Sequence, residues 1–486
     1  MKLEELIKVL DHKEIKNYDK NIDIKGISYN SQLTKAGDIF VCLQGEYSDG
    51  HNWAKMAKER GAIALLCERA LDIQLPQIIV DSTRQRIATV AALLNDYPSK
   101  NLSLFGVTGT NGKTTVTHLL QKIFEANEKK CALIGTLGYK LSSEDTYHDA
   151  KHTTPQAPEL QATLKKIVDE KIDLTVMEVS SHALEQNRVG ECIFSGAVLT
   201  NLTQDHLDYH ITMDNYFEAK ALLFKNLKEG SLAVINADDN YAQKFISVVP
   251  CGVKILTYGI KNSADIVASN IEFSTTGASF DFNYAGKTRR INLKMNGLFS
   301  VYNALAALTT AVAAGMDLSL SVSVLESTAG VAGRFEIVNN KPMVIVDYAH
   351  TPDGLENVLK TAREITPKGA NLVCLFGCGG DRDATKRPKM GSIADKLADK
   401  IIVTSDNPRS EDPQQIISDI LTGIQSINPQ RVFVEEDRGV AISLIKKIAK
   451  EKDVVLVAGK GHEDYQILKD KTIHFDDREE VRKLYL

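Results

Sequence analysis

The chain has 486 residues, 43% of them hydrophobic and 25% charged, which is typical of a soluble globular protein of about two to four domains. Its 31 glycines and 12 prolines are too few for a collagenous or low-complexity chain. The net charge of −5 includes no basic block, which argues against DNA or RNA as a main partner.

The N-terminal residues alternate in charge and hydrophobicity, without the apolar core of a signal peptide, and no apolar run reaches the roughly 18 residues of a membrane span. The seven cysteines are scattered and odd in number, and no second Cys/His pair completes a zinc site. We therefore expect free thiols in a reducing compartment, a cytoplasmic location and no membrane partner. Nothing in the sequence specifies an oligomer, so we expect a monomer.

The pattern along the chain predicts an α/β protein of three domains, at residues 1–101, 102–332 and 333–486. The first segment mixes short helices and strands, such as 37–45 and 77–82, and ends in a polar, proline-bearing stretch at 97–101 that we interpret as a linker. In the second segment a strand at 102–109 precedes a Gly/Thr loop and a helix at 114–127. Further short apolar runs alternate with helices, which predicts a parallel sheet with crossover helices.

The third segment follows a Gly-containing passage at 327–336 and contains buried-strand patterns at 342–350, 370–377, 400–407 and 453–461. Helical stretches separate them, so we predict a C-terminal Rossmann-like domain. In both α/β segments, polar residues follow directly where an apolar run ends: Glu178, Asn201, Asp347, Asp381, Asp406 and Lys460. Because ligands bind beyond the carboxyl ends of parallel strands, we expect the chemistry between the second and third domains.

The loop between the predicted strand and helix is typical of a phosphate-binding loop. It comprises Gly109, Thr110, Asn111, Gly112, Lys113, Thr114 and Thr115. Its glycines let backbone N–H groups approach phosphate oxygens, Lys113 would neutralise the β- and γ-phosphates, and the Thr114 hydroxyl would bind Mg²⁺. The spacing departs from the usual pattern, since Val107 occupies the expected first glycine position. The motif indicates ATP or another nucleoside triphosphate without specifying the reaction.

A metal-bound nucleotide also needs a carboxylate at the end of a neighbouring strand. Glu178 stands at such a position, and His206 follows another strand. Both side-chain types suit Mg²⁺ or Mn²⁺. Alone, either residue is more often structural, but their positions after the phosphate loop favour a metal site.

Several motifs occur together in one order: GTNGKTT, EVSSHALEQNRV, TNLTQDHLDYH, YFEAKALLF, GRFE, DYAHTPDGL, GCGGDRD, DNPRSEDP and AGKGHEDYQ. This set, which spans essentially the whole chain, resembles the Mur ligases of peptidoglycan synthesis. It is most similar to the branch that adds the third amino acid to UDP-N-acetylmuramoyl-L-Ala-D-Glu. GTNGKTT is shared with folylpolyglutamate synthetases, whereas DNPR with GHEDYQ is much narrower.

The resemblance implies a UDP-binding N-terminal domain, a central ATPase domain and a C-terminal amino-acid-binding domain. It implies amide formation through an acyl phosphate, with ATP as co-substrate and Mg²⁺ as cofactor. The implied catalytic residues are Lys113, Glu178, His206 and Lys220, and the implied metal ligands are Thr114, Glu178, His206 and Lys220. Beyond the phosphate loop, Asn303, Arg334, Asp347 and His350 resemble residues that contact ATP when the domains close. Asn303 alternatively packs its Ala-rich helix, and Arg334 alternatively forms a surface ion pair.

The resemblance also implies the contacts to the UDP-N-acetylmuramoyl-dipeptide, at Tyr29, Ser31, Glu46, Tyr47, Ser48, His152, Thr153, Thr154, Ser180, Gln186 and Arg188. The family's Asp-Ser-Arg is Asn30-Ser31-Gln32 here, and His152 replaces a frequent Asn. The UDP stretches could alternatively be plain surface turns. Ser180 lacks the glycines of a nucleophile elbow, so we do not expect a nucleophilic serine.

Lys220 lies among apolar residues within the predicted helix NYFEAKALLF. The sequence alone suggests an ordinary lysine whose amine reaches solvent. In the Mur ligases the matching lysine is carbamoylated by CO₂, giving N6-carboxylysine, a carboxylate-like Mg²⁺ ligand. Because CO₂ reacts with the neutral amine, a desolvated site that lowers the pKa of Lys220 is physically consistent with this modification.

The third amino acid implied by the resemblance is meso-diaminopimelate, contacted by Arg382, Asp406, Asn407, Pro408, Arg409, Gly459 and Glu463. A guanidinium binds the far carboxylate of this substrate bidentately, and Glu463 pairs with its ammonium. L-Lysine, the alternative substrate, lacks that carboxylate and would leave Arg409 unpaired. Arg409 could otherwise be a surface arginine in a turn.

Two other functions compete with this one. A folylpolyglutamate synthetase shares the phosphate loop but lacks both the N-terminal module and the DNPR motif. A regulatory protein would bind nucleotide without amine-dependent phosphate release. The Lys-Thr of the loop suits a triphosphate with Mg²⁺ and argues against a dinucleotide-dependent oxidoreductase.

Overall fold

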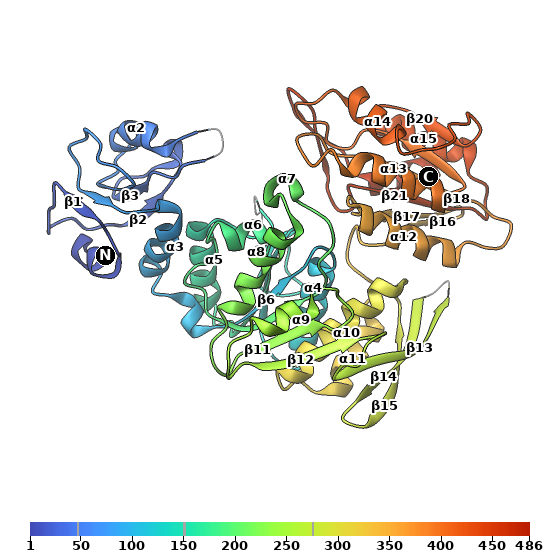
Figure 1. The fold of residues 1–486 in the computed structure, drawn as a ribbon, viewed down its shortest axis with the longest axis horizontal. Coiled ribbons are helices and arrows are strands. Elements are labelled where there is room, and N and C mark those ends of the chain that lie inside the picture. The colour runs from blue at the N-terminus through green and yellow to red at the C-terminus, as the bar shows by residue number, and fades with distance from the viewer. Residues whose placement is uncertain (46–47, 149–151, 275–276) are drawn as a thin grey trace.

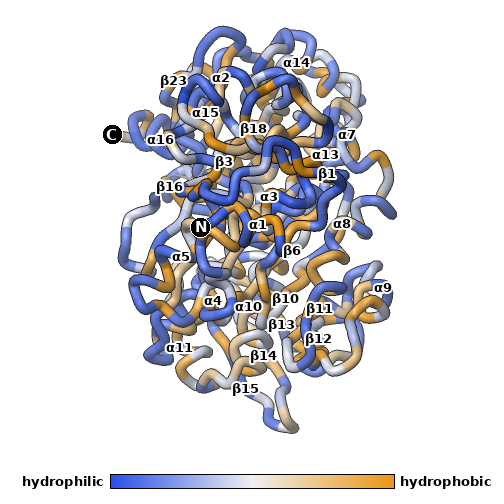
Figure 2. Tube along the Cα trace, turned by 90° about the vertical axis from the view of Figure 1, so that its left-hand side faces the viewer, coloured by the Kyte–Doolittle hydropathy of each residue, from blue (hydrophilic) through white to orange (hydrophobic). Residues whose placement is uncertain are grey.

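The computed structural model describes residues 1–45, 48–148, 152–274 and 277–486. Glu46 and Tyr47, two of the predicted UDP contacts, lie outside the described residues. In Figure 1 an N-terminal and a C-terminal unit each adjoin a central unit and lie apart from one another. Hydrophobic residues concentrate along internal strands, whereas the outer helix α16 (Asp477–Tyr485) is largely hydrophilic (Figure 2).

The N-terminal unit contains a sheet of order β1-β5-β4-β3-β2 that is parallel except for its β1 edge. Its strands are β1 (Glu14–Lys16), β2 (Gly26–Ser28), β3 (Asp38–Val41), β4 (Ala64–Cys67) and β5 (Gln77–Ile79), and its helices are α1 (Leu3–Val9), α2 (Ala54–Glu59) and α3 (Thr83–Leu94), with short 3-10 turns η1 (Ser31–Leu33) and η2 (Gly50–Trp53). The stretch that we interpreted as a linker forms a further 3-10 turn, η3 (Pro98–Asn101). Ser99 is buried there, and its hydroxyl donates to the Glu191 carbonyl of the central unit at 3.1 Å.

The central sheet has the order β15-β14-β13-β12-β11-β10-β6-β9-β7-β8. Its strands are β6 (Ser103–Thr108), β7 (Cys131–Gly135), β8 (Gly138–Lys140), β9 (Leu174–Glu178), β10 (Phe194–Leu199), β11 (Leu232–Asn236), β12 (Lys254–Gly259), β13 (Ile266–Ser274), β14 (Gly277–Tyr284) and β15 (Lys287–Leu293). The run from β7 to β13 is parallel, as predicted. The antiparallel strands β8, β14 and β15 extend it at both edges, which we did not predict.

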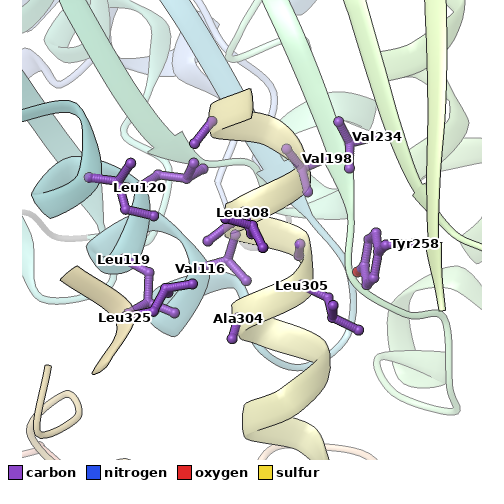
Figure 3. Close-up of a cluster of buried hydrophobic side chains, with 14 of the residues drawn as sticks. Val116, Leu119, Leu120, Val198, Val234, Tyr258, Ala304, Leu305, Leu308 and Leu325 are labelled. Carbon is purple, nitrogen blue, oxygen red and sulfur yellow. The ribbon is translucent and has the colours of Figure 1, made fainter. Parts of the chain in front are cut away.

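Helices cover this sheet, and their apolar faces form its core. They are α4 (Lys113–Ala126), α5 (Ala157–Asp169), α6 (Ser181–Glu185), α7 (Leu207–His210), α8 (Met213–Lys225), α9 (Ala242–Ser247), α10 (Leu298–Ala313) and α11 (Leu318–Ser327). Figure 3 shows side chains of α10 between those of α4 on one side and those of strands β10 to β12 on the other. The small residues Ala304, Ala307 and Ala311 of α10 are buried, which permits this close packing.

The C-terminal unit has a sheet of order β16-β17-β21-β18-β19-β20 that is parallel except for the β16 edge. Its strands are β16 (Glu336–Asn340), β17 (Met343–Asp347), β18 (Leu372–Phe376), β19 (Lys400–Val403), β20 (Val432–Val434) and β21 (Val454–Ala458), followed by the hairpin β22 (Tyr465–Ile467) and β23 (Thr472–His474). The remaining helices are α12 (Pro352–Ile365), α13 (Lys386–Leu397), α14 (Pro413–Leu421) and α15 (Arg438–Ile448). This arrangement agrees with the predicted Rossmann-like fold.

The chain enters the C-terminal unit at Gly333, which lies directly against the loop after β21. A Cβ atom on Gly333 would lie 2.1 Å from the backbone nitrogen of His462. The Gly333 carbonyl accepts a 3.0 Å hydrogen bond from the Tyr348 backbone N–H. Only glycine therefore fits at position 333. These contacts hold the start of the C-terminal unit against the rest of that unit.

Within the described residues, no helix is long and apolar enough to cross a membrane.

Candidate active site

The phosphate loop connects β6 to α4, and two of its glycines are required by close contacts. A Cβ atom on Gly109 would lie 1.8 Å from the Thr200 hydroxyl, and one on Gly112 would lie 2.4 Å from the Asn303 side-chain oxygen. Gly112 also has a φ of 86° and precedes the first residue of α4. The loop thus directs the N-terminus of a helix toward the position expected for phosphate, with Asn303 against it.

The loop is held by residues that follow β10. The Asn111 backbone N–H donates to the Asn201 side-chain oxygen at 2.9 Å, and the Asn111 carbonyl accepts from the Thr200 hydroxyl at 2.6 Å. The Thr110 hydroxyl donates to the Thr203 carbonyl at 3.1 Å. These contacts fix the loop conformation in advance, so that little ordering is required when an anion binds.

Lys113 begins α4 and folds back over the loop. Its Nζ donates to the carbonyls of Gly109 and Thr110, both at 2.9 Å. Burial lowers the pKa of Lys113, and the nearby Glu178 carboxylate opposes that effect. The lysine therefore stands within the loop, as its proposed role in phosphate binding requires.

Thr114 and Glu178 supply adjacent oxygen atoms beside the loop. The Thr114 hydroxyl donates to Glu178 Oε2 at 3.0 Å, and Glu178 Oε1 accepts from the Thr136 backbone N–H at 2.9 Å. Glu178 is buried at the end of β9, and Arg334 of the C-terminal unit reaches the same Thr114 hydroxyl at 3.1 Å. A hydroxyl next to a buried carboxylate suits Mg²⁺, which prefers oxygen ligands.

His206 and Lys220, the other two predicted metal ligands, both lie close enough to Asp205 to interact with its charge. His206 Nε2 lies 3.2 Å from Asp205 Oδ2, and burial lowers the pKa of His206 to about 3. Lys220 is buried on α8, and its Nζ donates to the Gly109 carbonyl at 2.9 Å. Burial and the nearby Lys113 place the pKa of Lys220 well below its usual value.

Lys220 therefore does not extend to solvent as the sequence alone suggested. Among the residues that the structure describes, no three His, Cys, Asp or Glu side chains gather into a group that could hold a metal. Among the described side chains, the Thr114 hydroxyl and the Glu178 carboxylate are the oxygen ligands best placed to bind a metal ion, and they contact each other. A carboxylate created on Lys220 by CO₂ would add an oxygen donor next to the loop.

The predicted dipeptide contacts form one hydrogen-bonded network after β9. The Thr154 hydroxyl donates to the Glu178 carbonyl at 2.8 Å and accepts from the Ser180 backbone N–H at 3.0 Å. Arg188 donates to the Thr154 carbonyl at 3.1 Å and to Gln186 Oε1 at 2.7 Å. Thr153 shares a 3.1 Å hydrogen bond with Thr136, and His152 is exposed nearby in the sequence. Because the Glu178 side chain also contacts Thr114, this network adjoins the phosphate loop.

The predicted UDP contacts are more dispersed. Tyr29 donates to Glu159 of the central unit at 2.7 Å, whereas Ser31 is buried with its hydroxyl 3.4 Å from the Met56 sulfur. Ser48 accepts a 2.8 Å hydrogen bond from the indole of Trp53, which is 46% exposed. Asn30 caps the η1 turn by accepting from the Gln32 backbone N–H at 2.9 Å. Asn30 thus has a local structural role here.

A cavity of about 320 Å³ lies between the phosphate loop and the C-terminal unit. Its lining includes several predicted ATP contacts: Asn111, Gly112, Thr115, Asn303, Arg334 and Asp347. Asp347 accepts hydrogen bonds from the backbone N–H groups of Phe335 and Ala349, both at 2.7 Å. The size and the convergent polar groups fit a nucleoside.

A second cavity, of about 200 Å³, joins the central unit to the predicted diaminopimelate site. It is lined by Asp205, His206, Asp208, Tyr348, His350, Gly379, Arg382, Asp383, Lys386, Asp406, Asn407, Arg409, Gly459 and Glu463. All of the predicted diaminopimelate residues except Pro408 belong to this lining. Pro408 instead packs its carbonyl against Gly380, where a Cβ atom would lie 2.0 Å away.

At the end of this cavity that contains the predicted diaminopimelate residues, oppositely charged side chains are held by hydrogen bonds. Arg409 donates to the Gly380 carbonyl at 2.8 Å, and Glu463 accepts from the Asn407 side chain at 2.9 Å. Lys460, which is fully buried, lies 3.3 Å from Glu463 Oε2 and 3.5 Å from Asp406 Oδ1. A guanidinium and a carboxylate side by side can recognise a zwitterionic group.

Models of known families match the chain along most of its length. Residues 23–102 match the catalytic domain of the Mur ligase family, residues 107–311 the Mur ligase middle domain, and residues 333–461 the Mur ligase glutamate ligase domain. The chain belongs to the Mur ligase family. The resemblance drawn from the sequence motifs is thereby confirmed.

Individual relatives of this Mur ligase span its whole length. It is 46% identical to the UDP-N-acetylmuramoyl-L-alanyl-D-glutamate–2,6-diaminopimelate ligase of Syntrophomonas wolfei, with 100% of this chain and 99% of that protein covered. It is 45% identical to the protein of the same name from Bacillus velezensis, with 99% and 98% covered. A solved structure described by the same name is similar at a TM-score of 0.69 and 35% identity, with 100% and 98% covered. This Mur ligase is an ATP-dependent amide ligase.

Sequence reasoning about this Mur ligase missed three residues that line the two cavities: Asp205, Asp353 and Lys386. It noted Lys460 as a polar residue at a strand end but gave it no role in the site. Asp205 directly precedes the predicted His206, and Lys460 directly follows the predicted Gly459. For both residues, the position next to a predicted site residue was therefore the signal that the sequence offered. Lys386 and Asp353 look like ordinary surface charges in the sequence, and only the fold brings them to the site.

Proposed function

We propose that this Mur ligase joins meso-diaminopimelate to UDP-N-acetylmuramoyl-L-Ala-D-Glu, with ATP converted to ADP and phosphate, in the cytoplasm. The observation that carries the proposal is the 200 Å³ cavity in which Asp205 and His206 of the central unit face Arg409 and Glu463 of the C-terminal unit. The names of the full-length relatives support the same substrates. We assign residues 1–101 to the UDP-binding domain, 102–332 to the ATP-binding domain and 333–486 to the amino-acid-binding domain.

In the first step a carboxylate oxygen of the D-Glu residue bonds to the γ-phosphorus of ATP, while the bond from that phosphorus to the β-phosphate oxygen breaks and ADP leaves. A carboxylate is a poor electrophile, whereas the resulting acyl phosphate has a good leaving group. Lys113, within the phosphate loop, neutralises charge on the β- and γ-phosphates. Arg334 contacts Thr114 from the C-terminal unit and so adds a second cation when the units are together.

In the second step the amine of diaminopimelate bonds to the carbonyl carbon and loses a proton, and the bond from that carbon to the phosphate oxygen breaks. Inorganic phosphate departs. Arg409 binds the far carboxylate and Glu463 the far ammonium, which directs the near amine toward Asp205 and His206. Because burial keeps His206 neutral, it does not repel the incoming amine, and the proton that the amine loses leaves with the departing phosphate or passes to solvent.

Mg²⁺ would be held by Thr114 and Glu178, with His206 and carbamoylated Lys220 as further ligands. When bound, it supplies Lewis-acid stabilisation of charge on the phosphoryl oxygens. Burial lowers the pKa of Lys220, which favours the neutral amine, the form that reacts with CO₂. The remaining steps depend on the side chains described above.

The same ligation with L-lysine is the second candidate. Lysine lacks the far carboxylate, so Arg409 would stay half-buried without an anion, at a cost in binding. A folylpolyglutamate synthetase is a weaker candidate, because residues 23–102 match the N-terminal Mur ligase model and the relatives extend across them.

The test is phosphate release from ATP in the presence of UDP-N-acetylmuramoyl-L-Ala-D-Glu, with either meso-diaminopimelate or L-lysine as the amine. We expect release with diaminopimelate and little with lysine. Release with lysine alone would keep the ligase and overturn the role of Arg409. ATP binding without release in either case would favour a regulatory nucleotide-binding protein.

A further inference from the structure

Lys386 is the first residue of α13 and is only 7% exposed, yet it lines the 200 Å³ cavity. No carboxylate of the described residues forms an ion pair with it. The neighbouring Arg387 differs in this respect, since it pairs with Glu411 at 2.8 Å and Asp419 at 2.9 Å. The buried charge of Lys386 therefore lacks a direct ion-pair partner of the kind that Arg387 has, and Asp205 of the same cavity lining interacts with it only at longer range.

The position of Lys386 at the N-terminus of α13 further disfavours its positive charge. The N-terminus of α13 carries partial positive charge from the helix, which disfavours a cation. A buried lysine at this end is costly unless an anion joins it. An anion bound in the cavity would be attracted by both the ammonium and the helix N-terminus. The arrangement thus fits an anionic ligand.

The surroundings of Lys386 indicate which part of the reaction supplies that anion. Its charge acts on Asp205 of the central unit and on His350, where it helps to lower the pKa of His350, chiefly depressed by burial, to about 4. Arg409 and Glu463 influence each other at the amino-acid end of the cavity. Lys386 therefore belongs to the end of the cavity next to Asp205 of the central unit, the unit that also contains the phosphate loop.

We propose that Lys386 is a catalytic residue that binds the phosphoryl oxygens of the acyl phosphate, so that the C-terminal unit completes the phosphoryl site. This inference rests on the proposed function. During the reaction the phosphoryl group moves from the phosphate loop toward the amine site, and a compact ammonium between the two sites stabilises its charge at that stage. The same ammonium assists departure of inorganic phosphate when the C–O bond breaks.

A carboxylate of the incoming diaminopimelate is the other anion that could reach Lys386. Hydroxylamine separates the two sources, because it attacks an acyl phosphate but carries no carboxylate. ADP release with UDP-N-acetylmuramoyl-L-Ala-D-Glu is measured with diaminopimelate and, separately, with hydroxylamine as the nucleophile. The variants are Lys386→Met, which keeps length and removes charge, and Lys386→Arg. The control is Lys396→Met, an exposed lysine of the same helix.

We expect Lys386→Met to lower kcat by about 100-fold with both nucleophiles, with KM for diaminopimelate little changed. Lys386→Arg should recover part of the rate, and Lys396→Met should match wild type. The melting temperature of Lys386→Met should not fall, because the substitution removes a buried charge that has no direct ion-pair partner among the described residues. A fall would indicate a structural role and overturn the proposal.

An unchanged hydroxylamine reaction with a raised KM for diaminopimelate would overturn the proposal in favour of the substrate carboxylate. Unchanged rates with both nucleophiles would overturn it altogether. Absence of ADP release by the wild-type enzyme with either nucleophile would instead refute the proposed function.

Discussion

The side-chain amide of Asn111 on the phosphate loop donates a 2.9 Å hydrogen bond to the carboxylate of Asp353 in the first turn of α12. The Thr203 hydroxyl donates to the same carboxylate oxygen at 3.2 Å. Asp353 therefore connects the C-terminal unit directly to the loop that is expected to bind ATP. This contact couples the position of one unit to the conformation of the other.

Substitution of Asp353 by alanine should lower kcat/KM for ATP by about tenfold. A hydrogen bond to a charged group contributes about 1.5–3 kcal/mol, and about 1.4 kcal/mol corresponds to a factor of ten. Steady-state kinetics with varied ATP measure the effect. Lys360→Ala is the control, because Lys360 pairs with Glu356 on the exposed side of the same helix. An unaltered kcat/KM would show that the contact does not contribute to the assembly of the site.

Replacement of Arg409 by methionine should reduce kcat/KM for diaminopimelate by about 100-fold, since losing one partner of a buried charge pair costs about 2–5 kcal/mol. Arg409 is oriented by its 2.8 Å hydrogen bond to the Gly380 carbonyl, and KM for ATP should not change. Competition assays with diaminopimelate and lysine provide the measurement. Arg482→Met, at an exposed ion pair with Glu336, is the matched control. An unaffected KM for diaminopimelate would contradict the assignment.

Enzyme depleted of CO₂ should regain activity when bicarbonate is added, whereas Lys220→Arg should be inactive with or without it. Burial and Lys113 lower the pKa of Lys220, which favours the neutral amine that reacts with CO₂. An arginine stays charged and cannot form the carbamate. The measurement is phosphate release before and after bicarbonate addition in degassed buffer. Equal activity of wild type under both conditions would argue against the modification.

Acidification from pH 6.5 to pH 4 should destabilise the protein partly through His118. Burial lowers the pKa of His118 to about 4, and its ring contacts the Thr114 carbonyl and the Tyr147 hydroxyl. In this range the unfolded state binds a proton that the folded state does not, so stability falls as pH falls. The loss from His118 amounts to about 3 kcal/mol and is complete below about pH 4.

The change in melting temperature between pH 7 and pH 5 measures this effect. His118→Gln should show a smaller change than wild type, because glutamine does not titrate. His474→Gln serves as the control, since His474 is exposed beside Glu479, which raises its pKa. Identical pH dependence of His118→Gln and wild type would refute the assignment to His118.

The sequence predicted those parts of the fold and site that local pattern determines. Gly109 and Gly112 belong to a contiguous loop motif between a strand and a helix, and Glu178 ends a strand whose apolar run is visible in the sequence. The contacts that require these glycines, with Thr200 and Asn303, come from distant parts of the chain. The contact between Asn111 and Asp353 joins residues 242 positions apart, so only tertiary packing reveals it. Lys386 was missed because a buried lysine without a counter-ion cannot be distinguished from a surface lysine by sequence alone.

The antiparallel edge of the central sheet was missed for a different reason. Strands β13 to β15 alternate between buried and exposed residues only in part, and β15 begins with a run of four exposed residues. The alternation that distinguishes a half-buried strand is therefore weak there. Edge strands with one solvated face therefore have a weaker hydrophobic pattern in the sequence, which makes them harder to predict.

The contact between Gly333 and the loop at His462 has a consequence for how this protein can be re-engineered. Residues from Gly333 onward are fixed to the C-terminal unit, and α11 of the central unit ends at Ser327. The joint between the two units is therefore confined to residues 328–332. Lengthening this short connection would change how far the C-terminal unit can move relative to the central unit. It would leave unchanged the residues that each unit contributes to the cavities.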